Sequence, residues 1–320
     1  MNFRKFFTFP ARNLITVIPC VICIALISGQ FINTSPLKIF ILPVSMLTIF
    51  PAMIGFQPRE LITLNDFRLL SVNLALNFLA LPLAALLIGW LLLEQWPELR
   101  IGLLIISVVP GGNMALAFTM MFKGNVKGSL KLSTCNLILG SLLAPLYLYV
   151  LAGTLVEIDI LNIAKTIGIV VFIPLFCGII TYNLLLQRYS QKQFKTDIKP
   201  LLPAFSVWGL IYLVFTSVSM KAGMVFSYPE LIVQALSSLV LWYCAVIILC
   251  VAIGRRFFCH KDAISLLLNV ELRNLPICIG IAITAFPPQT AMMVALAFLF
   301  QQQFAIWFCK FDTKYGLLTK

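Results

Sequence analysis

Charged residues are scarce in this chain of 320 residues. Lys, Arg, Asp and Glu together make up 11% of it, and there is one histidine, whereas a typical soluble domain is about 25% charged. Hydrophobic residues make up 61%, and the mean hydropathy is +1.02. Because this apolar surplus exceeds what a protein core can hold, much of it must face lipid. The composition predicts an integral membrane protein.

The sequence also lacks the usual catalytic and metal-binding motifs. It has no Ser-His-Asp set, HExxH or Gly-rich phosphate loop, and His260 falls in a predicted loop. Most of the nine cysteines lie in apolar segments, where a free thiol packs as a small hydrophobe. Cys20 and Cys23 form a C-x-x-C without further ligands nearby. We therefore expect no enzyme activity, no cofactor and no structural metal.

Apolar segments of the length that crosses a bilayer run along the whole chain. A spanning helix needs about 20 such residues, and short joints rich in Pro, Gly and charge separate the segments. No part is left for a soluble domain, so residues 1–320 form one membrane domain. The ten predicted spans are 14–33, 38–56, 69–93, 100–121, 129–153, 159–186, 201–220, 229–253, 263–285 and 289–309.

Basic residues predict the orientation of these spans. If the N-terminus is cytoplasmic, seventeen of the 23 Lys and Arg residues lie on the cytoplasmic side. The opposite side receives three: Lys38, Arg100 and Lys221. This bias predicts cytoplasmic N- and C-termini in a membrane of the bacterial inner type. It also accounts for the net charge of +12 without a nucleic-acid partner. Lipid is the expected neighbour, and the oligomeric state stays open.

Two predicted spans are interrupted at matching places. Five spans precede residue 155 and five follow it, so the second half enters from the opposite face, as in an inverted repeat. The fourth span breaks at Pro110–Asn113 and the ninth at Asn269–Pro276. Unwound backbone at membrane depth is tolerated only against protein or a wet cavity. Paired breaks of this kind are typical of a transport site.

The residues around both breaks resemble those of the bile acid/sodium symporter superfamily, which includes arsenite permeases. The resemblance is carried by "VVPGGNMALAFTMMFKGN" from Val108, and by "RNLPICIGIAITAFP" from Arg273. "IFPAMIGFQPREL" is closest to the arsenite-permease-like branch. The resemblance implies an all-α fold of ten helices in a 5+5 inverted repeat (about 14–153 and 159–309), with helices 4 and 9 discontinuous and crossing. Helices 3–5 and 8–10 would form a core and helices 1, 2, 6 and 7 a panel.

Candidate site residues follow from the breaks and the resemblance. The solute-binding candidates are Asn77, Gly111, Gly112, Asn113, Arg273, Asn274 and Gln303. The coupling-ion candidates are Ser129, Lys131, Ser133, Asn136, Asn269 and Glu271. Ser129, Ser133 and Asn136 share one helix face, which alternatively serves only to hold helices together.

The few charges inside predicted spans leave alternatives open. Arg273 either contacts an anionic solute or clamps freed carbonyls of the break. Glu271 pairs with Arg273 or Lys131, or carries a proton. Lys131 snorkels to the interface, or its ammonium replaces a sodium ion. Lys165 is expected to snorkel.

Departures from the family pattern bear on the solute and the coupling ion. Ala115 and Leu116 stand where a Ser-Asn pair is expected, and Asn269 stands in place of an acid. The sodium site is therefore degraded, and three alternatives stay open: coupling to a proton, coupling to sodium at this degraded site, or no coupling ion. Gly111 replaces the cysteine of arsenite permeases, which counts against arsenite. In view of Arg273 we expect a permease for a small organic anion; the alternatives are arsenite efflux or a non-transporting sensor or scaffold.

Overall fold

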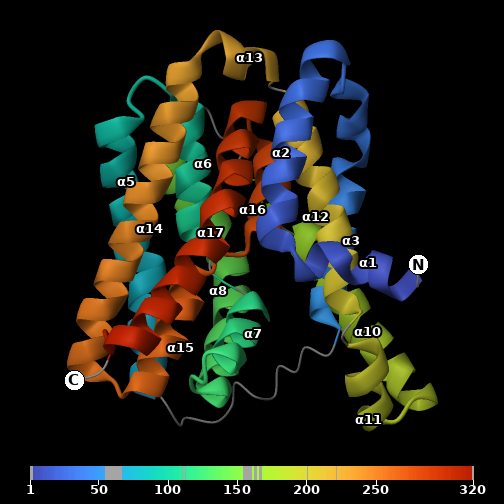
Figure 1. Ribbon diagram of the computed structural model, residues 1–320, viewed down its shortest axis with the longest axis vertical. Helices are drawn as coiled ribbons and strands as arrows, with labels where there is room; N and C mark the ends of the chain where they lie inside the picture. Colours follow the sequence, from blue (N-terminus) through green and yellow to red (C-terminus); the bar gives the residue numbers. More distant parts are fainter. Residues whose placement is uncertain are drawn as a thin grey trace. The chain divides into compact units, whose positions relative to one another are not determined.

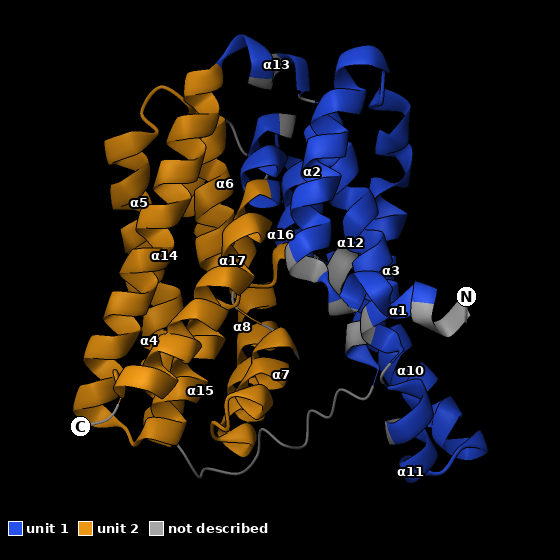
Figure 2. Cartoon of the chain, viewed as in Figure 1, with its two compact units in different colours: residues 1–57, 161–228, 276–295 blue, residues 58–160, 229–275, 296–320 orange. Residues whose placement is uncertain are grey.

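A computed structural model describes residues 3–54, 67–109, 111, 113–153, 161, 164–165, 168–199, 201–220 and 222–318. Within these ranges the regular structure is helical (Figure 1). The chain divides into two compact units (Figure 2). Unit 1 contains residues 1–57, 161–228 and 276–295, and unit 2 contains residues 58–160, 229–275 and 296–320.

Unit 1 is built from helices of both halves of the chain. Its α12 packs against α2 and α3. Gly29 allows α2 to approach α12 closely, because a Cβ on Gly29 would collide with the backbone of Ser219. Its elements are α1 (Phe3–Arg12), α2 (Leu14–Phe31), η1 (Ser35–Phe40), α3 (Ile41–Met53), η4 (Gly168–Phe172), α10 (Ile173–Arg188), α11 (Gln191–Gln193), η5 (Phe194–Ile198), α12 (Leu202–Ser219), α13 (Ala222–Ser227), most of α16 (Leu275–Ala285) and the start of α17 (Pro288–Tyr315).

Unit 2 contains the two helix ends, Val108 and Glu271, at which the predicted fourth and ninth spans are interrupted. Its α15 packs against α14, α7, α8 and α4. Its elements are α4 (Phe67–Ala75), η3 (Leu76–Ala80), α5 (Leu81–Leu92), α6 (Pro97–Val108), α7 (Asn113–Met121), α8 (Val126–Ala152), α14 (Pro229–Phe257), α15 (His260–Glu271) and the rest of α17.

The predicted membrane location is supported by the lengths of the apolar helices. In the described part of the chain, five helices are long and apolar enough to span: Phe67–Leu92, Val126–Ala152, Pro229–Phe257, His260–Ala285 and Gln289–Tyr315. Three shorter apolar helices cover Thr16–Phe31, Ser35–Pro51 and Ala204–Ser219. The chain is therefore an integral membrane protein, and the full number of ten spans stays a prediction. Parts of the predicted spans 38–56 and 159–186 lie outside the described residues.

Several helices extend beyond the predicted spans. Helix α8 begins at Val126 rather than 129, because the Asn125 side chain caps it by accepting from the Gly128 amide at 2.9 Å. Helices α14 and α17 continue to Phe257 and Tyr315, and Gly254, directly after the predicted span, lies inside α14 without ending it. The sequence thus predicted the apolar segments better than the helix ends.

A π-helical turn interrupts the helix formed by α4 and α5. In this turn the Leu81 amide donates to the carbonyl of Leu76, five residues earlier. Pro82 has no N–H, so it cannot donate to the Phe78 carbonyl four residues earlier. The Tyr147 hydroxyl of α8 donates to the freed Phe78 carbonyl at 2.6 Å. This turn, which the sequence analysis did not predict, contains Asn77.

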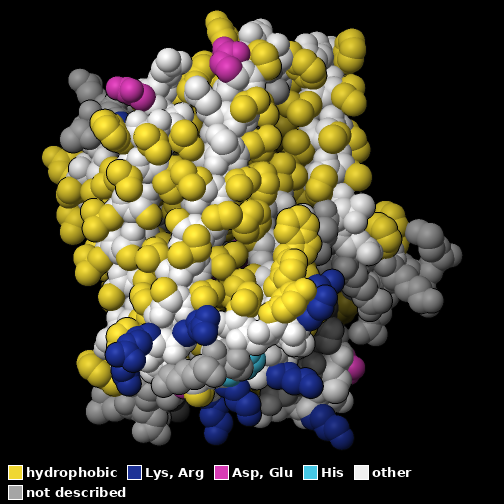
Figure 3. All heavy atoms as spheres, turned by 60° about the vertical axis from the view of Figure 1, so that its left-hand side comes forward, with side chains coloured by type: hydrophobic (Ala, Val, Ile, Leu, Met, Phe, Trp, Pro, Cys, Tyr) yellow, Lys and Arg dark blue, Asp and Glu magenta, His cyan; other side chains and the backbone are white. Residues whose placement is uncertain are grey.

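Charges separate along the helices of unit 2. Helix α14 has Glu230 in its first turn and Arg255 and Arg256 in its last. Figure 3 shows apolar side chains over the face in view, with Lys and Arg gathered at its lower end. Basic residues at one end of a span are the basis on which an orientation is predicted, and the orientation itself stays a prediction.

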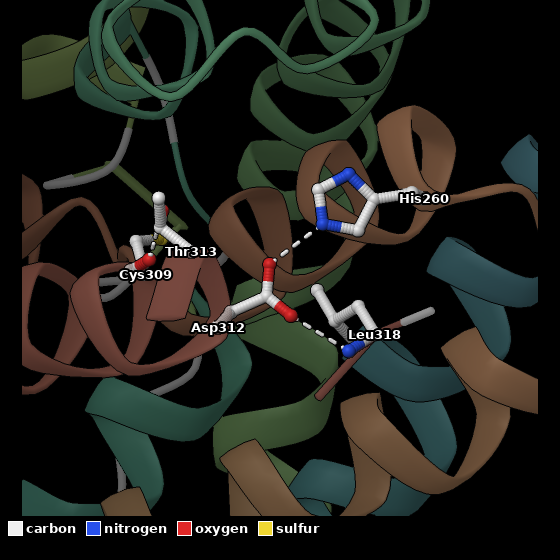
Figure 4. A network of polar contacts seen from close by, with 5 residues as sticks. All are labelled: His260, Cys309, Asp312, Thr313 and Leu318. Carbon is white, nitrogen blue, oxygen red and sulfur yellow. Dashed lines mark hydrogen bonds and ion pairs between the residues drawn. The ribbon is translucent and has the colours of Figure 1, made fainter. Parts of the chain in front are cut away.

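The C-terminal segment is fastened to unit 2 by Asp312 of α17 (Figure 4). One carboxylate oxygen lies 2.7 Å from His260 Nε2 at the start of α15, and the other accepts from the Leu318 amide at 2.6 Å. Gly316 makes the intervening turn with a positive φ of 64°, which glycine adopts without steric cost. The Leu318 side chain is buried.

Candidate functional site

The first break separates α6 from α7, as predicted. Helix α6 ends at Val108, and Val109 has an extended backbone (φ −90°, ψ 97°). An extended residue is expected there because proline disfavours helical backbone in the residue before it. Helix α7 begins at Asn113. Pro110, Gly112 and the Asn113 side chain lie outside the described residues, so the predicted roles of Gly112 and Asn113 stay predictions.

The second break separates α15 from α16 and touches the first. Helix α15 ends at Glu271, Leu272 is extended (φ −79°, ψ 95°), and α16 begins at Leu275. A Cβ on Gly111 would collide with the Leu272 carbonyl oxygen and lie 3.2 Å from the Asn269 carbonyl oxygen. Glycine is therefore required for the backbone of one break to approach that of the other.

Arg273, predicted either as an anion contact or as a clamp, clamps the ends of the two broken helices. It is 2% exposed. Its Nε donates to the Ile106 carbonyl at 2.9 Å, and Nη2 donates to the Ser107 carbonyl. Its Nη1 donates to Asn77 Oδ1 and to the Val270 carbonyl at 3.2 Å. The guanidinium thus satisfies carbonyls that the end of α6 leaves without helical partners.

Two further side chains hold Arg273 in place. Gln301 of α17 bonds its backbone in both directions, accepting from the amide at 2.9 Å and donating to the carbonyl at 3.1 Å. The guanidinium carbon lies 5.9 Å from the ring centre of Trp242 on α14, which is fully buried. Cation–π contact with a desolvated tryptophan stabilises such a charge.

Asparagines connect the Arg273 cluster to the predicted coupling-ion residues. Asn77 Nδ2 donates to the Asn73 carbonyl and to Asn73 Oδ1, at 2.9 and 3.1 Å. Asn73 Nδ2 donates to Asn136 Oδ1 at 2.6 Å. Asn136 Nδ2 lies 3.3 Å from the Asn269 carbonyl oxygen. All four asparagines are fully buried.

Asn269 binds the serines that were predicted to help hold a coupling ion. Its Nδ2 donates to Ser129 Oγ and to the Ser265 carbonyl, both at 2.8 Å. The Ser133 hydroxyl donates to Asn269 Oδ1 at 2.6 Å. Thr119 of α7 donates to Ser129 Oγ at 2.9 Å. The amide nitrogen thus contacts two oxygen atoms of a kind that could otherwise bind a cation.

The remaining charged candidates differ from the predicted pairs. Among the described residues, neither carboxylate oxygen of Glu271 has a hydrogen-bond partner, so the predicted pairing with Arg273 or Lys131 is not made through a hydrogen bond there. Lys131 is buried on α8, which is not the position expected of a snorkelling side chain. Lys165 is exposed, as expected of one.

Gln303 was favoured over Gln301 from the sequence, but Gln301 contacts the break. Gln303 is half-buried, and its Oε1 has no hydrogen-bond partner among the described residues. Asn274 is half-buried next to Arg273. Asn73 was missed, although its i, i+4 spacing from Asn77 places both on one helix face. The roles of Gln303 and Asn274 stay predictions.

We expect Asn269→Asp to make stability depend on sodium. The change removes the donor to Ser129 and Ser265, and it adds an anion beside their oxygens. Leaving such buried partners unsatisfied costs about 1–3 kcal/mol, while a cation bound to the folded state restores stability by mass action. The Tm of the variant should be lower in choline chloride than in sodium chloride of equal concentration, and the wild-type Tm should be the same in both salts.

Asn269→Ala is the matched control, because it loses the same donors without gaining a carboxylate. It should be destabilised equally in both salts. An Asn269→Asp variant whose Tm does not respond to sodium would contradict the view that these oxygens form a cation site once the amide is removed.

Comparison with known proteins agrees with this geometry. A model described as the Sodium Bile acid symporter family matches residues 42–228, more than half of the chain. A Bacillus subtilis protein named YbaS is 28% identical over 232 residues, covering 71% of this chain and 73% of that protein. The proteins of this family are transporters rather than enzymes, and sodium as a coupling ion is consistent with the family.

Two further relatives have names that state a function. A rice protein named a probable sodium/metabolite cotransporter is 31% identical over 128 residues, which is 38% of this chain and 30% of that protein. The arsenical-resistance protein Acr3 of Corynebacterium glutamicum is 24% identical over 189 residues, which is 56% of this chain and 51% of that protein. The chain therefore spans about half or less of these two relatives.

Proposed function

Because the chain belongs to the sodium bile acid symporter family, we propose that it is a secondary active transporter that moves a small solute by alternating access. The observation that carries this proposal is the contact of Gly111 with the Leu272 carbonyl. Two broken helices that meet inside a membrane protein present free backbone groups to a solute. The network through Arg273 and Asn77 holds this backbone in place.

We propose the predicted 5+5 inverted repeat as the architecture of the chain. Matching lengths support it: α6 and α15 both have 12 residues, α7 and α16 have 9 and 11, and α8 and α17 have 27 and 28. Both breaks also leave their helix through an extended residue whose amide bonds the carbonyl four residues earlier, at 3.1 Å. Helices α2 and α10 also end at an extended residue bonded in this way, so the matching lengths are the stronger support.

The proposed core contains helices α4–α8 and α14–α17, and the proposed panel contains α1–α3 and α10–α13. The hydrogen-bond network from Arg273 to Thr119 supports this division, because its residues lie in core helices or, for Arg273, in the break between two of them. The core would include all of α16 and α17, parts of which fall in unit 1. Motion of the panel against this network would expose the breaks to each side in turn.

The proposed solute is a small organic anion. Its contacts would be the backbone of Gly111 and Gly112 together with Asn113, Asn274 and Gln303, with Arg273 and Asn77 behind them. Two observations support a negative charge: α7 and α16 begin at the breaks, and helix N-termini favour anions. Arg273 and Lys131 are also the buried basic residues of the described chain.

Arsenite efflux is the second candidate, and the similarity to Acr3 favours it. Gly111 supplies no thiol at the first break, whereas trivalent arsenic prefers soft thiolate ligands. A strain that expresses the protein should therefore grow no better on arsenite than the parent strain. Protection against arsenite would replace the organic anion with arsenite as the proposed solute.

Flux in proteoliposomes tests the proposed function. Purified protein is reconstituted, and counterflow of radiolabelled aliphatic mono- and dicarboxylates, cholate and arsenite is measured, after a thermal-shift screen of the same compounds. We expect counterflow of at least one carboxylate, and its loss in Asn113→Ala without a change in Tm. Stabilisation by a carboxylate without any flux would instead favour a sensor with this fold. The proposed orientation, with both termini cytoplasmic in a bacterial inner membrane, is tested by labelling single cysteines near the termini.

A further inference from the structure

A groove on the surface of unit 2 is lined by apolar side chains. It lies between the helix formed by α4, η3 and α5 and the last part of α14, and it holds about 470 Å³. Ile253 and Phe257 line it from α14. Six residues line it from the other helix: Val72, Ala75, Leu76, Leu79, Ala80 and Leu83.

The six residues of α4, η3 and α5 form one stripe along their helix. They follow Val72 by 3, 4, 7, 8 and 11 residues, which places them on a single helix face. A rise over this length is about 16 Å, and the hydrocarbon of one leaflet is about 15 Å thick, half of a core of about 30 Å. The groove therefore has the length of an acyl chain in one leaflet.

Small residues keep this groove open. Ala75 and Ala80 lie among leucines along the stripe, so the helix has single methyl groups where longer side chains would fill the space. Ala75, Leu79 and Leu83 are exposed. The groove thus opens to the surroundings of the helices, which for a spanning segment are lipid chains.

Arg68 brings a positive charge to one end of the groove. It lies in α4 four residues before Val72, so it continues the stripe. Its guanidinium carbon lies 5.3 Å from the ring centre of Phe257, which also lines the groove, and 5.8 Å from that of Phe258. Arg68 is exposed and makes no ion pair with an acid of the described chain. Two aromatic rings thus hold the guanidinium, and its N–H groups remain free for an anion.

Other charges at this end also favour an anion. Arg255 and Arg256 are exposed in the last turn of α14. The described acids at the start of α15 and near the end of α17 have other partners: Asp262 accepts from Asn125 Nδ2 at 2.8 Å, and Asp312 makes the contacts in Figure 4. Among the described side chains, the positive charge at this end of the groove is therefore not compensated.

We propose that this groove is a binding site for one anionic phospholipid. An acyl chain lies along the stripe from Val72 to Leu83, and the headgroup phosphate accepts hydrogen bonds from Arg68. Arginine suits this role because its planar fork binds phosphate through two parallel N–H donors. This end of α14 is the predicted cytoplasmic end, and anionic lipids are attracted to basic residues there. The proposal requires only that unit 2 lies in a membrane, and it does not depend on the transport function.

Native mass spectrometry of the delipidated full chain tests the site. The probes are phosphatidylglycerol and phosphatidylcholine with the same acyl chains, titrated separately into the protein in detergent. We expect one phosphatidylglycerol to bind with a Kd about tenfold lower than that of phosphatidylcholine, because the arginines favour a headgroup with net negative charge. Arg68→Gln should bring the two Kd values together. Arg188→Gln, which removes the same charge from an exposed position at the end of α10, should keep the preference.

A second pair of variants tests the groove itself. Ala75→Leu fills the groove and should raise the Kd of phosphatidylglycerol about tenfold, as overpacking of a fitted site does. Ala252→Leu makes the same change at an exposed alanine of α14 that does not line the groove, and this variant should bind as the wild type does. Phosphatidylglycerol with a photoreactive diazirine in one acyl chain should label residues 72–83 or 253–257. Free glycerol phosphate should not compete, because the site binds the chain as well as the phosphate.

Several results would overturn the proposal. Equal Kd values for the two lipids in the wild type would identify an unspecific lipid-facing surface. An unchanged preference in Arg68→Gln, unchanged binding in Ala75→Leu, or labelling confined to other helices would place the lipid elsewhere. Competition by glycerol phosphate would assign the arginines to a soluble phosphate compound, and a lipid-free dimer that Ala75→Leu dissociates would assign the groove to a second copy of the chain. The wild-type Kd values and the labelling decide the outcome even if a variant does not fold.

Discussion

Arg273→Ala is expected to unfold unit 2 at a much lower temperature than the wild type, rather than only to weaken solute binding. The substitution leaves the carbonyls of Ile106, Ser107 and Val270 without their donors in a buried place. A hydrogen bond to a charged group contributes about 1.5–3 kcal/mol, and several are lost together. We therefore expect a loss of at least about 3 kcal/mol in the free energy of unfolding, measured by thermal or denaturant unfolding in detergent.

Arg273→Lys separates the shape of the guanidinium from its charge. Lysine keeps the charge, but its ammonium is compact and cannot reproduce the planar set of donors that reaches these separate acceptors. Its stability should lie between those of Arg273→Ala and the wild type. Arg256→Ala, at the exposed end of α14, serves as the control and should change stability by about 0.5 kcal/mol or less. An Arg273→Ala protein with wild-type stability and no transport would instead assign Arg273 to the solute.

The helix breaks could be predicted because proline and glycine act locally. Pro110 restricts the backbone of Val109, so the end of α6 follows from the sequence. Pro276 lies in the first turn of α16, a position that proline tolerates, so it marks where α16 begins rather than where α15 ends. The length of an apolar segment likewise predicts that it spans a membrane. The end of a helix outside the membrane is less constrained, which is why α14 and α17 extend beyond the predicted spans.

The partners of the site residues could not be predicted in the same way. Arg273 bonds mainly to backbone carbonyls, which every residue has and no side-chain pattern reveals. Gln301 and Gln303 lie two residues apart on a helix and point about 200° apart, so their order in the sequence does not say which one meets the break. The substitution of an acid by Asn269 was visible in the sequence, but its bonds to Ser129 and Ser133 depend on how α15 and α8 pack.

Gly111→Ala is expected to separate the two breaks, and it therefore tests the contact on which the proposed function rests. The new methyl group would overlap the Leu272 carbonyl oxygen. A flexible side chain could move away, but this atom belongs to the backbone between α15 and α16, which Arg273 and Gln301 hold in place. Overpacking costs about 1–3 kcal/mol, and we expect a value near the upper end together with loss of counterflow.

Gly223→Ala is the matched control for this change. It lies in α13, and a Cβ there would meet nothing within 4 Å, so the change should be neutral or stabilise the helix by up to about 1 kcal/mol. Both variants add one methyl group to a glycine, so a difference in their Tm values reports the local surroundings of Gly111. If Gly111→Ala unfolds at the wild-type temperature and transports normally, the two breaks are not in contact in the working protein, and the case for a solute site between their backbones fails.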